Sequence, residues 1–191
     1  MRLFVAVEIA PHVAAGAAVL IEALRRRAER LAPHARITWI PEERLHVTVR
    51  FIGNADAPKV EAIRSALEPP IGAVPFDLAF AGAGAFPKAG APRVLWCGVA
   101  DGGEPLRGVE REITDRLHRA GVAPESRDYR PHLTLARIRD AGGLKSASLL
   151  EGLADQVVGT TRVEAITLFE SRLSPTGPTY VPLRRAPLRR V

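Results

Sequence analysis

The chain has 191 residues, which fits one domain or one domain of two similar lobes; 47% of the residues are hydrophobic and 25% are charged. This balance is that of an ordinary globular protein, which excludes disorder over most of the chain, and no apolar run approaches the length of a membrane span. The net charge is +6, and all but three of the 27 basic residues are arginines, whose planar donor groups suit phosphate. A GC-rich coding sequence would give the same bias, so an anionic partner is one of two explanations.

Apolar periodicity divides the chain into strands and helices. Strands are predicted over 2–9, 36–40, 45–52, 76–82, 93–99, 131–138, 162–170 and 179–183. Helices are predicted over 11–31, 58–67, 104–120 and 144–153, with a loop over 82–92, a turn over 174–178 and a basic, partly loose tail over 184–191. Because strands do not alternate regularly with helices, this order favours an α+β fold with antiparallel sheets.

The single cysteine, Cys97, lies in an apolar run and can form no intramolecular disulfide, which favours a reducing compartment. An acid follows only five apolar residues near the start of the chain, which is too short a run for the core of a signal peptide. We therefore expect a cytoplasmic protein.

An approximate internal repeat is the most informative feature of the sequence. Arg-Leu-His-Val-Thr-Val at 44–49 is matched by Arg-Pro-His-Leu-Thr-Leu at 130–135, close to half the chain later. Each copy begins a strongly predicted strand that lies between two predicted helices. The repeat predicts a single domain, 1–191, made of two similar lobes that each supply one His-x-Thr-x strand (46–49 and 132–135).

Alternation along a strand places the His and the Thr of each copy on one face. The polar faces hold Arg44, His46, Thr48 and Arg50 in the first copy and Arg130, His132 and Thr134 in the second. Strict alternation puts Phe51 and Arg137 on the opposite, aliphatic faces. If the two strands lie side by side, two histidines and two threonines meet in one cleft.

Two histidines in one cleft can make both proton transfers that the opening of a cyclic phosphodiester needs, since one takes a proton from water and the other protonates the leaving oxygen. Threonine hydroxyls can donate to the non-bridging oxygens, and arginine can offset the developing charge. No cofactor is required, and a zinc site would want a third protein ligand that no HExxH motif or cysteine cluster supplies. One His-x-Thr on a strand is often structural, but a purely structural duplication has no need to keep the pair twice.

The chain resembles the 2H phosphoesterase superfamily, and most of all the bacterial and archaeal RNA 2′,3′-cyclic phosphodiesterases, which are also described as 2′-5′ RNA ligases. The resemblance rests on the two motifs and on their surroundings in nearly the whole chain. The matching stretches are RLFVAV at 2–7, WIPEERLHVTVRFIG at 39–53, GAFP at 84–87, PRVLW at 92–96, RPHLTLAR at 130–137 and LFESRLS at 168–174.

This resemblance implies a bilobal α+β fold of two antiparallel sheets flanked by helices, with the active-site cleft between the lobes. It implies hydrolysis of an RNA 2′,3′-cyclic phosphate to a 2′-phosphomonoester without a metal. By analogy His46 is the proton donor to the leaving 3′ oxygen and His132 is the proton acceptor that activates water. Thr48 and Thr134 would hold the phosphate. The symmetry of the motifs alone would allow the two histidine roles to be exchanged.

Four further residues are candidates for substrate binding. Arg137 matches a family arginine near the substrate, provided that twist or a strand end brings it to the histidine face, and Arg130 is the alternative phosphate ligand. Phe51 is a candidate for stacking a base, although alternation favours a place in the core. Tyr129 adjoins the second motif and either lines the cleft or is an ordinary amphipathic residue.

The expected partner is RNA with a 2′,3′-cyclic phosphate end, with tRNA fragments among the candidates, or a cyclic nucleotide. No membrane contact is expected, and the chain is expected to be a monomer. Three alternatives stay open: 2′-5′ ligation by the reverse reaction, a phosphodiesterase of small nucleotides, and a non-catalytic RNA-binding module. The last predicts that one His or Thr is missing, and all four are present.

Overall fold

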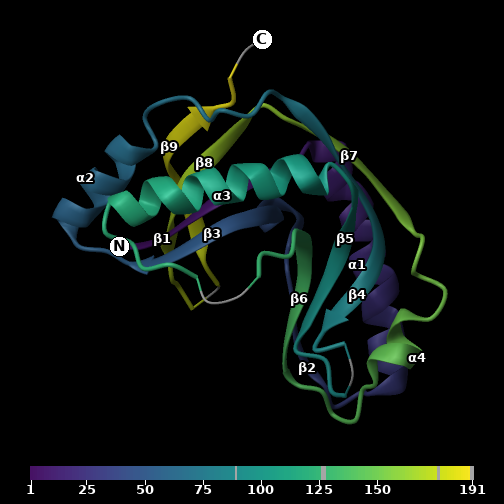
Figure 1. Cartoon of the computed structure of the whole chain (residues 1–191). Helices are drawn as coiled ribbons and strands as arrows, with labels where there is room; N and C mark the ends of the chain where they lie inside the picture. The colour runs from purple at the N-terminus through teal and green to yellow at the C-terminus, as the bar shows by residue number, and fades with distance from the viewer. Residues whose placement is uncertain (89, 126–127, 176, 190–191) are drawn as a thin grey trace.

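A computed structural model describes residues 1–88, 90–125, 128–175 and 177–189 of the chain. Its strands form one curled sheet with helices packed outside it (Figure 1). The strands are β1 (Arg2–Glu8), β2 (Arg36–Trp39), β3 (His46–Asn54), β4 (Phe76–Phe86), β5 (Val94–Asp101), β6 (His132–Asp140), β7 (Val157–Val163), β8 (Ala165–Arg172) and β9 (Thr179–Pro187). The helices are α1 (Pro11–Leu31), α2 (Ala57–Ala66), α3 (Gly103–Arg119) and α4 (Ser146–Leu150), with a 3₁₀ turn η1 (Glu42–Arg44).

Within the described residues the sheet has nine strands, of which eight follow the order β7-β4-β5-β6-β3-β1-β8-β9 and the ninth, β2, pairs with β6. All of these strand pairs are antiparallel, which confirms the α+β class. The expected two sheets are instead two halves of one sheet, because β3 and β6 meet at the single residue pair Val47↔Leu133. Each half therefore has its histidine strand innermost.

The chain crosses from one half of the sheet to the other between β7 and β8. β7 pairs with β4 at one edge, β8 pairs with β1 and β9 in the other half, and only Glu164 separates β7 from β8. The backbone amide of Leu188 donates to the Glu164 carbonyl at 2.8 Å and holds the chain at this crossing. The predicted single strand over 162–170 is therefore wrong, since the chain passes from one half of the sheet to the other within it.

The two long helices cover the core with the apolar stripes that the periodicity predicts. The buried residues of α1 include Val13, Leu20 and Leu24, and those of α3 include Leu106 and Ile113. Helix α1 packs on β7, whereas α3 packs on β3 and β5 (Figure 1). Both stripes join one hydrophobic core with the aliphatic faces of the strands. No helix in the described parts of the chain is long and apolar enough to cross a membrane.

Three other elements differ from the predicted ones by more than two residues in length. β4 continues to Phe86 through the predicted loop, because Gly82 takes a φ of 74° at a register shift and packs where a side chain would collide with the Ala154 carbonyl. Helix α4 has only five residues, and β9 extends through Pro187 into the predicted loose tail. Parts of the predicted loop, turn and tail lie outside the described residues, namely positions 89, 176 and 190–191.

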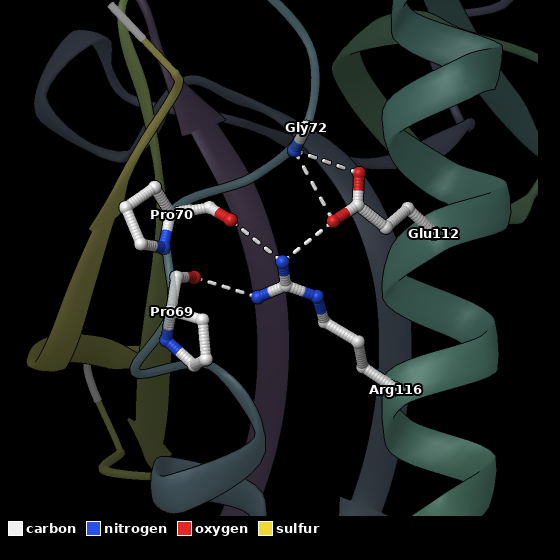
Figure 2. Close-up of polar contacts among 5 residues, drawn as sticks. All are labelled: Pro69, Pro70, Gly72, Glu112 and Arg116. Carbon is white, nitrogen blue, oxygen red and sulfur yellow. Dashed lines mark hydrogen bonds and ion pairs between the residues drawn. The ribbon is translucent and has the colours of Figure 1, made fainter.

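A polar cluster ties α3 to the segment that follows α2 (Figure 2). Arg116 donates from Nη1 to the Pro69 carbonyl and from Nη2 to the Pro70 carbonyl, each at 2.6 Å. Its Nη2 also lies 2.6 Å from Glu112 Oε1, and Glu112 accepts the backbone amide of Gly72. Only 13% of the Arg116 side chain is exposed, so these contacts are largely shielded from water.

Replacing Arg116 with methionine should lower the free energy of unfolding by about 1.5–3 kcal/mol, because two carbonyls and a carboxylate lose a charged donor. Urea denaturation followed by circular dichroism measures this. The control is Arg119→Met, which removes an exposed arginine from the same helix and should change stability by less than about 0.5 kcal/mol. Equal stability of the two variants would show that the cluster contributes nothing.

Candidate active site

The two His-x-Thr segments lie side by side at the centre of the sheet. β3 begins at His46, β6 begins at His132, and Val47 is paired with Leu133. Because the strands are antiparallel, the residues on either side of this pair are also opposite each other: His46 is opposite Thr134, and Thr48 is opposite His132. The Cα atoms of diagonal neighbours in such a pair lie about 7–8 Å apart, so both histidines can reach one phosphate-sized group between them.

Both imidazole rings are held by the same backbone contact. Nδ1 of His46 lies 2.8 Å from the Arg44 carbonyl, and Nδ1 of His132 lies 2.6 Å from the Arg130 carbonyl. A carbonyl can only accept, so in each ring Nδ1 carries the hydrogen and donates it. Nε2 is therefore the atom that each ring has available to accept or release a proton.

Burial and a nearby arginine lower the pKa of both rings. Desolvation is the largest cause for each, the hydrogen bond to the backbone carbonyl partly offsets it by raising the pKa, and the charge of Arg137 lowers it further. The same arginine, together with Arg44 and Arg2, also acts on the hydroxyl of the half-buried Tyr180, whose pKa is raised mainly by desolvation. Arg137 therefore lies close enough to both histidines to act on them electrostatically.

A β-bulge in β6 explains how Arg137 reaches the histidine face. Thr134 pairs with Trp96 and Ala136 pairs with Leu95, so Leu135 is an extra residue in β6. After this residue the alternation reverses: Ala136 is buried and Arg137 is exposed. The prediction that strict alternation puts Arg137 on the aliphatic face is therefore wrong.

The same bulge occurs at the matching position of β3. Thr48 pairs with Ala6 and Arg50 pairs with Val5, so Val49 is the extra residue. Phe51 consequently faces outward with 54% of its surface exposed, which corrects the expectation that it lies in the core. In the repeat, Phe51 occupies the position that Arg137 has in the other strand.

Arg50 is turned to the opposite side by this bulge. We expected it on the polar face, but it is only 5% exposed and its Nη2 donates to the Ala123 carbonyl at 2.6 Å. Its Nη1 lies 3.4 Å from a carboxylate oxygen of Glu125. Arg50 thus attaches β3 to the segment between α3 and β6 and takes no part in the polar face.

Tyr129 also supports this junction and does not project into the cleft. The residue is half-buried, and its hydroxyl donates to the backbone carbonyl of Thr48 at 3.0 Å. Burial raises the pKa of this hydroxyl, so it stays a hydrogen-bond donor. Arg130 is exposed, and its carbonyl, rather than its guanidinium, contacts His132.

Aromatic side chains that the sequence did not single out frame each histidine. Phe4 and Tyr180 lie 5.0 and 5.1 Å from the His46 ring between centroids, and Phe86 lies 5.3 Å from the His132 ring. Phe4 could have been found by alternation, since it shares a face of its strand with Arg2 and Glu8. The other two come from strands distant in sequence. These rings account for much of the burial of the imidazoles.

A pocket of about 590 Å³ adjoins His46 and is lined by residues of β1, β8, β9, η1 and the first turn of α1. No group of three or more His, Cys, Asp or Glu residues within the described ranges is arranged to hold a metal ion. Cys97 is buried, and burial raises the pKa of its thiol to about 12, so it is not a reactive thiolate.

Sequence comparison places this site within a known family. The family model of the 2′-5′ RNA ligase superfamily matches residues 11–174, which include both His-x-Thr strands and the residues discussed with them, apart from those of β1 and β9. The chain belongs to this superfamily, and the resemblance to the 2H phosphoesterases is thereby confirmed.

Two relatives and one solved structure show which members of the superfamily this chain is similar to. An RNA 2′,3′-cyclic phosphodiesterase of Aeropyrum pernix is 37% identical over 142 residues, which are 74% of this chain and 80% of the relative. One of Archaeoglobus fulgidus is 30% identical over 184 residues, 96% and 98% of the two chains. Among solved structures, Escherichia coli LigT complexed with NADP⁺ superposes with a TM-score of 0.66 and 26% identity, covering 98% of this chain and 96% of LigT.

Proposed function

We propose that this protein hydrolyses the 2′,3′-cyclic phosphate end of RNA to a 2′-phosphomonoester. The observation that carries the proposal is the pair of imidazoles on adjacent strands, each with Nδ1–H fixed on a carbonyl and Nε2 left for proton transfer. The names of relatives that match most of this chain support the same reaction. In this proposal the chain is a single domain of two similar lobes, each of which contributes one His-x-Thr strand.

Each histidine moves one proton in the proposed reaction. Nε2 of His132 takes a proton from water as the water oxygen forms a bond to phosphorus. The bond between phosphorus and O3′ breaks, and Nε2 of His46 gives its proton to O3′, so the phosphate stays on O2′. The assignment of acid and base follows the family resemblance. Because the imidazoles supply both proton transfers, no step of this route requires a metal.

The remaining site residues stabilise the phosphoryl group. Thr48 and Thr134 lie level with the two histidines and would donate hydroxyl hydrogens to the non-bridging oxygens. Arg137 would offset negative charge that develops on these oxygens, a role for which its effect on both imidazoles makes it a better candidate than Arg130. The exposed ring of Phe51 would stack on a base of the RNA.

Ligation is the second candidate, and the description of the matching superfamily favours it. By microscopic reversibility the same two histidines would join a 2′,3′-cyclic phosphate to a 5′-hydroxyl. Water at about 55 M competes with any 5′-hydroxyl end, so hydrolysis should dominate under ordinary conditions.

The test is incubation of the protein with an oligonucleotide that ends in a 2′,3′-cyclic phosphate, in the presence of excess EDTA. We expect full turnover and a 2′-phosphate product, mapped by its resistance to a 3′-specific phosphatase. Accumulation of 3′-phosphate would contradict the acid–base geometry, and loss of turnover in EDTA would contradict the metal-free route. Addition of a 5′-hydroxyl oligonucleotide in excess measures the ligation reaction in the same assay.

A further inference from the structure

The pocket beside His46 differs in chemistry from the phosphate site. Three carboxylate residues, Glu8, Glu42 and Glu43, line it against one arginine, Arg44. The three carboxylates make this lining less favourable for a phosphate than the space between the two histidines, where Arg137 provides positive charge. The pocket therefore suits an uncharged part of a nucleotide that carries N–H donors.

Glu8 is the carboxylate with a defined orientation. It is paired with His46 across β1 and β3, and its Oε2 accepts a hydrogen bond of 2.8 Å from the hydroxyl of Thr167, which is only 2% exposed. A carboxylate has about four acceptor positions, so Glu8 can still accept hydrogen bonds from a ligand. The buried threonine thus fixes an acceptor at the pocket, directly beside the proposed acid.

Arg44 is held at the same pocket by the loop between β8 and β9. Its Nη1 donates to the Pro178 carbonyl at 3.3 Å, and its guanidinium packs on Gly177, where a side chain would collide with it. A guanidinium has five N–H donors, so most of them remain for a ligand. The pocket therefore combines a fixed acceptor with a fixed donor.

The third component is an aromatic surface. Phe4 packs against Phe169 with ring centroids 5.3 Å apart and against Tyr180 at 4.9 Å, and all three rings line the pocket. Tyr180 is half-buried, so part of its ring is open to a ligand. Aromatic side chains of this kind stack on nucleobases. A volume of about 590 Å³ is within the usual range for a small-molecule site and is large enough for a nucleoside.

We propose that this pocket binds the base of the nucleotide that carries the cyclic phosphate, and that it prefers guanine; this rests on the cyclic phosphodiesterase function proposed above. Guanine offers two adjacent donors, N1–H and N2–H, to the Glu8 carboxylate, and its O6 and N7 accept from Arg44. Adenine and cytosine set an acceptor nitrogen beside their amino group, and uracil flanks its single N–H with two carbonyls. Each of these bases would place an acceptor against the carboxylate.

The experiment compares kcat/KM for the 2′,3′-cyclic phosphates of guanosine, inosine, adenosine, cytidine and uridine. We expect the guanosine value to exceed the uridine value by about 5- to 150-fold, the range that one bidentate side chain–base pair contributes. Inosine lacks the 2-amino group and should fall between them. Glu8→Gln should reduce the guanosine-to-uridine ratio toward one, and the matched control Glu29→Gln, an exposed residue of α1, should keep it. Because the ratio is measured on one preparation, a partly unfolded variant does not alter it.

The outcomes separate the base preference from the reaction itself. Hydrolysis of all five substrates with equal kcat/KM, or an unchanged ratio in Glu8→Gln, would overturn the guanine proposal and leave the hydrolase function intact. Hydrolysis of none would overturn the function. In that case calorimetric titration with guanosine and uridine 2′-monophosphates tests the pocket directly, and equal dissociation constants would overturn the base preference as well.

Discussion

Replacing His46 or His132 with alanine should lower kcat for a 2′,3′-cyclic phosphate by about 10²–10⁴-fold, the usual contribution of one general acid or base. Each variant removes one of the two Nε2 atoms proposed to transfer protons, while the second imidazole stays on its carbonyl. Because the two rings act in one reaction, the double variant should be little slower than the slower single variant. Steady-state rates, with product separated by chromatography, measure all three.

The control for both substitutions is His118→Ala, which removes an exposed histidine of α3. Its kcat should equal that of the unchanged protein. Turnover in His46→Ala or His132→Ala at the full rate would rule out the site assignment. A leaving group of low pKa, such as 4-nitrophenolate, should rescue the variant that lacks the acid and not the one that lacks the base, and this decides which histidine has which role.

Replacing Arg137 with glutamine should move the pH optimum of kcat/KM to higher pH. Its positive charge disfavours the imidazolium form of both rings, which together with burial holds their pKa values below the ordinary value near 6.5. The active form needs one ring neutral and one protonated, so the bell-shaped profile of the unchanged protein should lie on the acidic side of that value. Removal of the charge raises both pKa values, and both limbs of the profile shift upward.

The same substitution should lower kcat/KM at its optimum by about 10²–10³-fold, as the loss of a donor that stabilises developing negative charge usually does. Initial rates between pH 4 and pH 9 measure both effects. The matched control is Arg139→Gln, an exposed arginine two residues further along β6 whose charge does not act on the histidines. A profile that stays in place in Arg137→Gln would show that this charge does not reach the imidazoles.

The two halves of the repeat differ at the residue five positions after the histidine. Both histidine strands carry an extra residue three positions after the histidine, Val49 in β3 and Leu135 in β6. The residue five positions after the histidine is therefore turned to the cleft side in each strand. It is Phe51 in one strand and Arg137 in the other, so a symmetric backbone presents an apolar ring in one half and a charge in the other. The two His-x-Thr motifs are otherwise alike, so this difference distinguishes the β3 side of the cleft from the β6 side.

The buried and exposed faces of the two motif strands were predictable because they depend on local pattern. A duplicated His-x-Thr with aliphatic residues between the polar ones can bury one face only if His and Thr share the other face, and Val47 and Leu133 are indeed fully buried. The amphipathic stripes of α1 and α3 were predictable for the same reason. In each case the relevant signal lies within one element of the chain.

The sequence by itself thus determined the α+β class and the family resemblance, and it singled out His46, Thr48, His132 and Thr134 as candidates, because these follow from periodicity and repetition. Only the tertiary structure decided the positions of Phe51, Arg137 and Arg50, since a bulge depends on pairing with a neighbouring strand and reverses every side chain after it. It alone also brought Phe4, Tyr180 and Glu8 to His46, because they lie on strands that are far from β3 in the sequence. Short-range pattern specifies a strand face, whereas a binding site is assembled by contacts between distant strands.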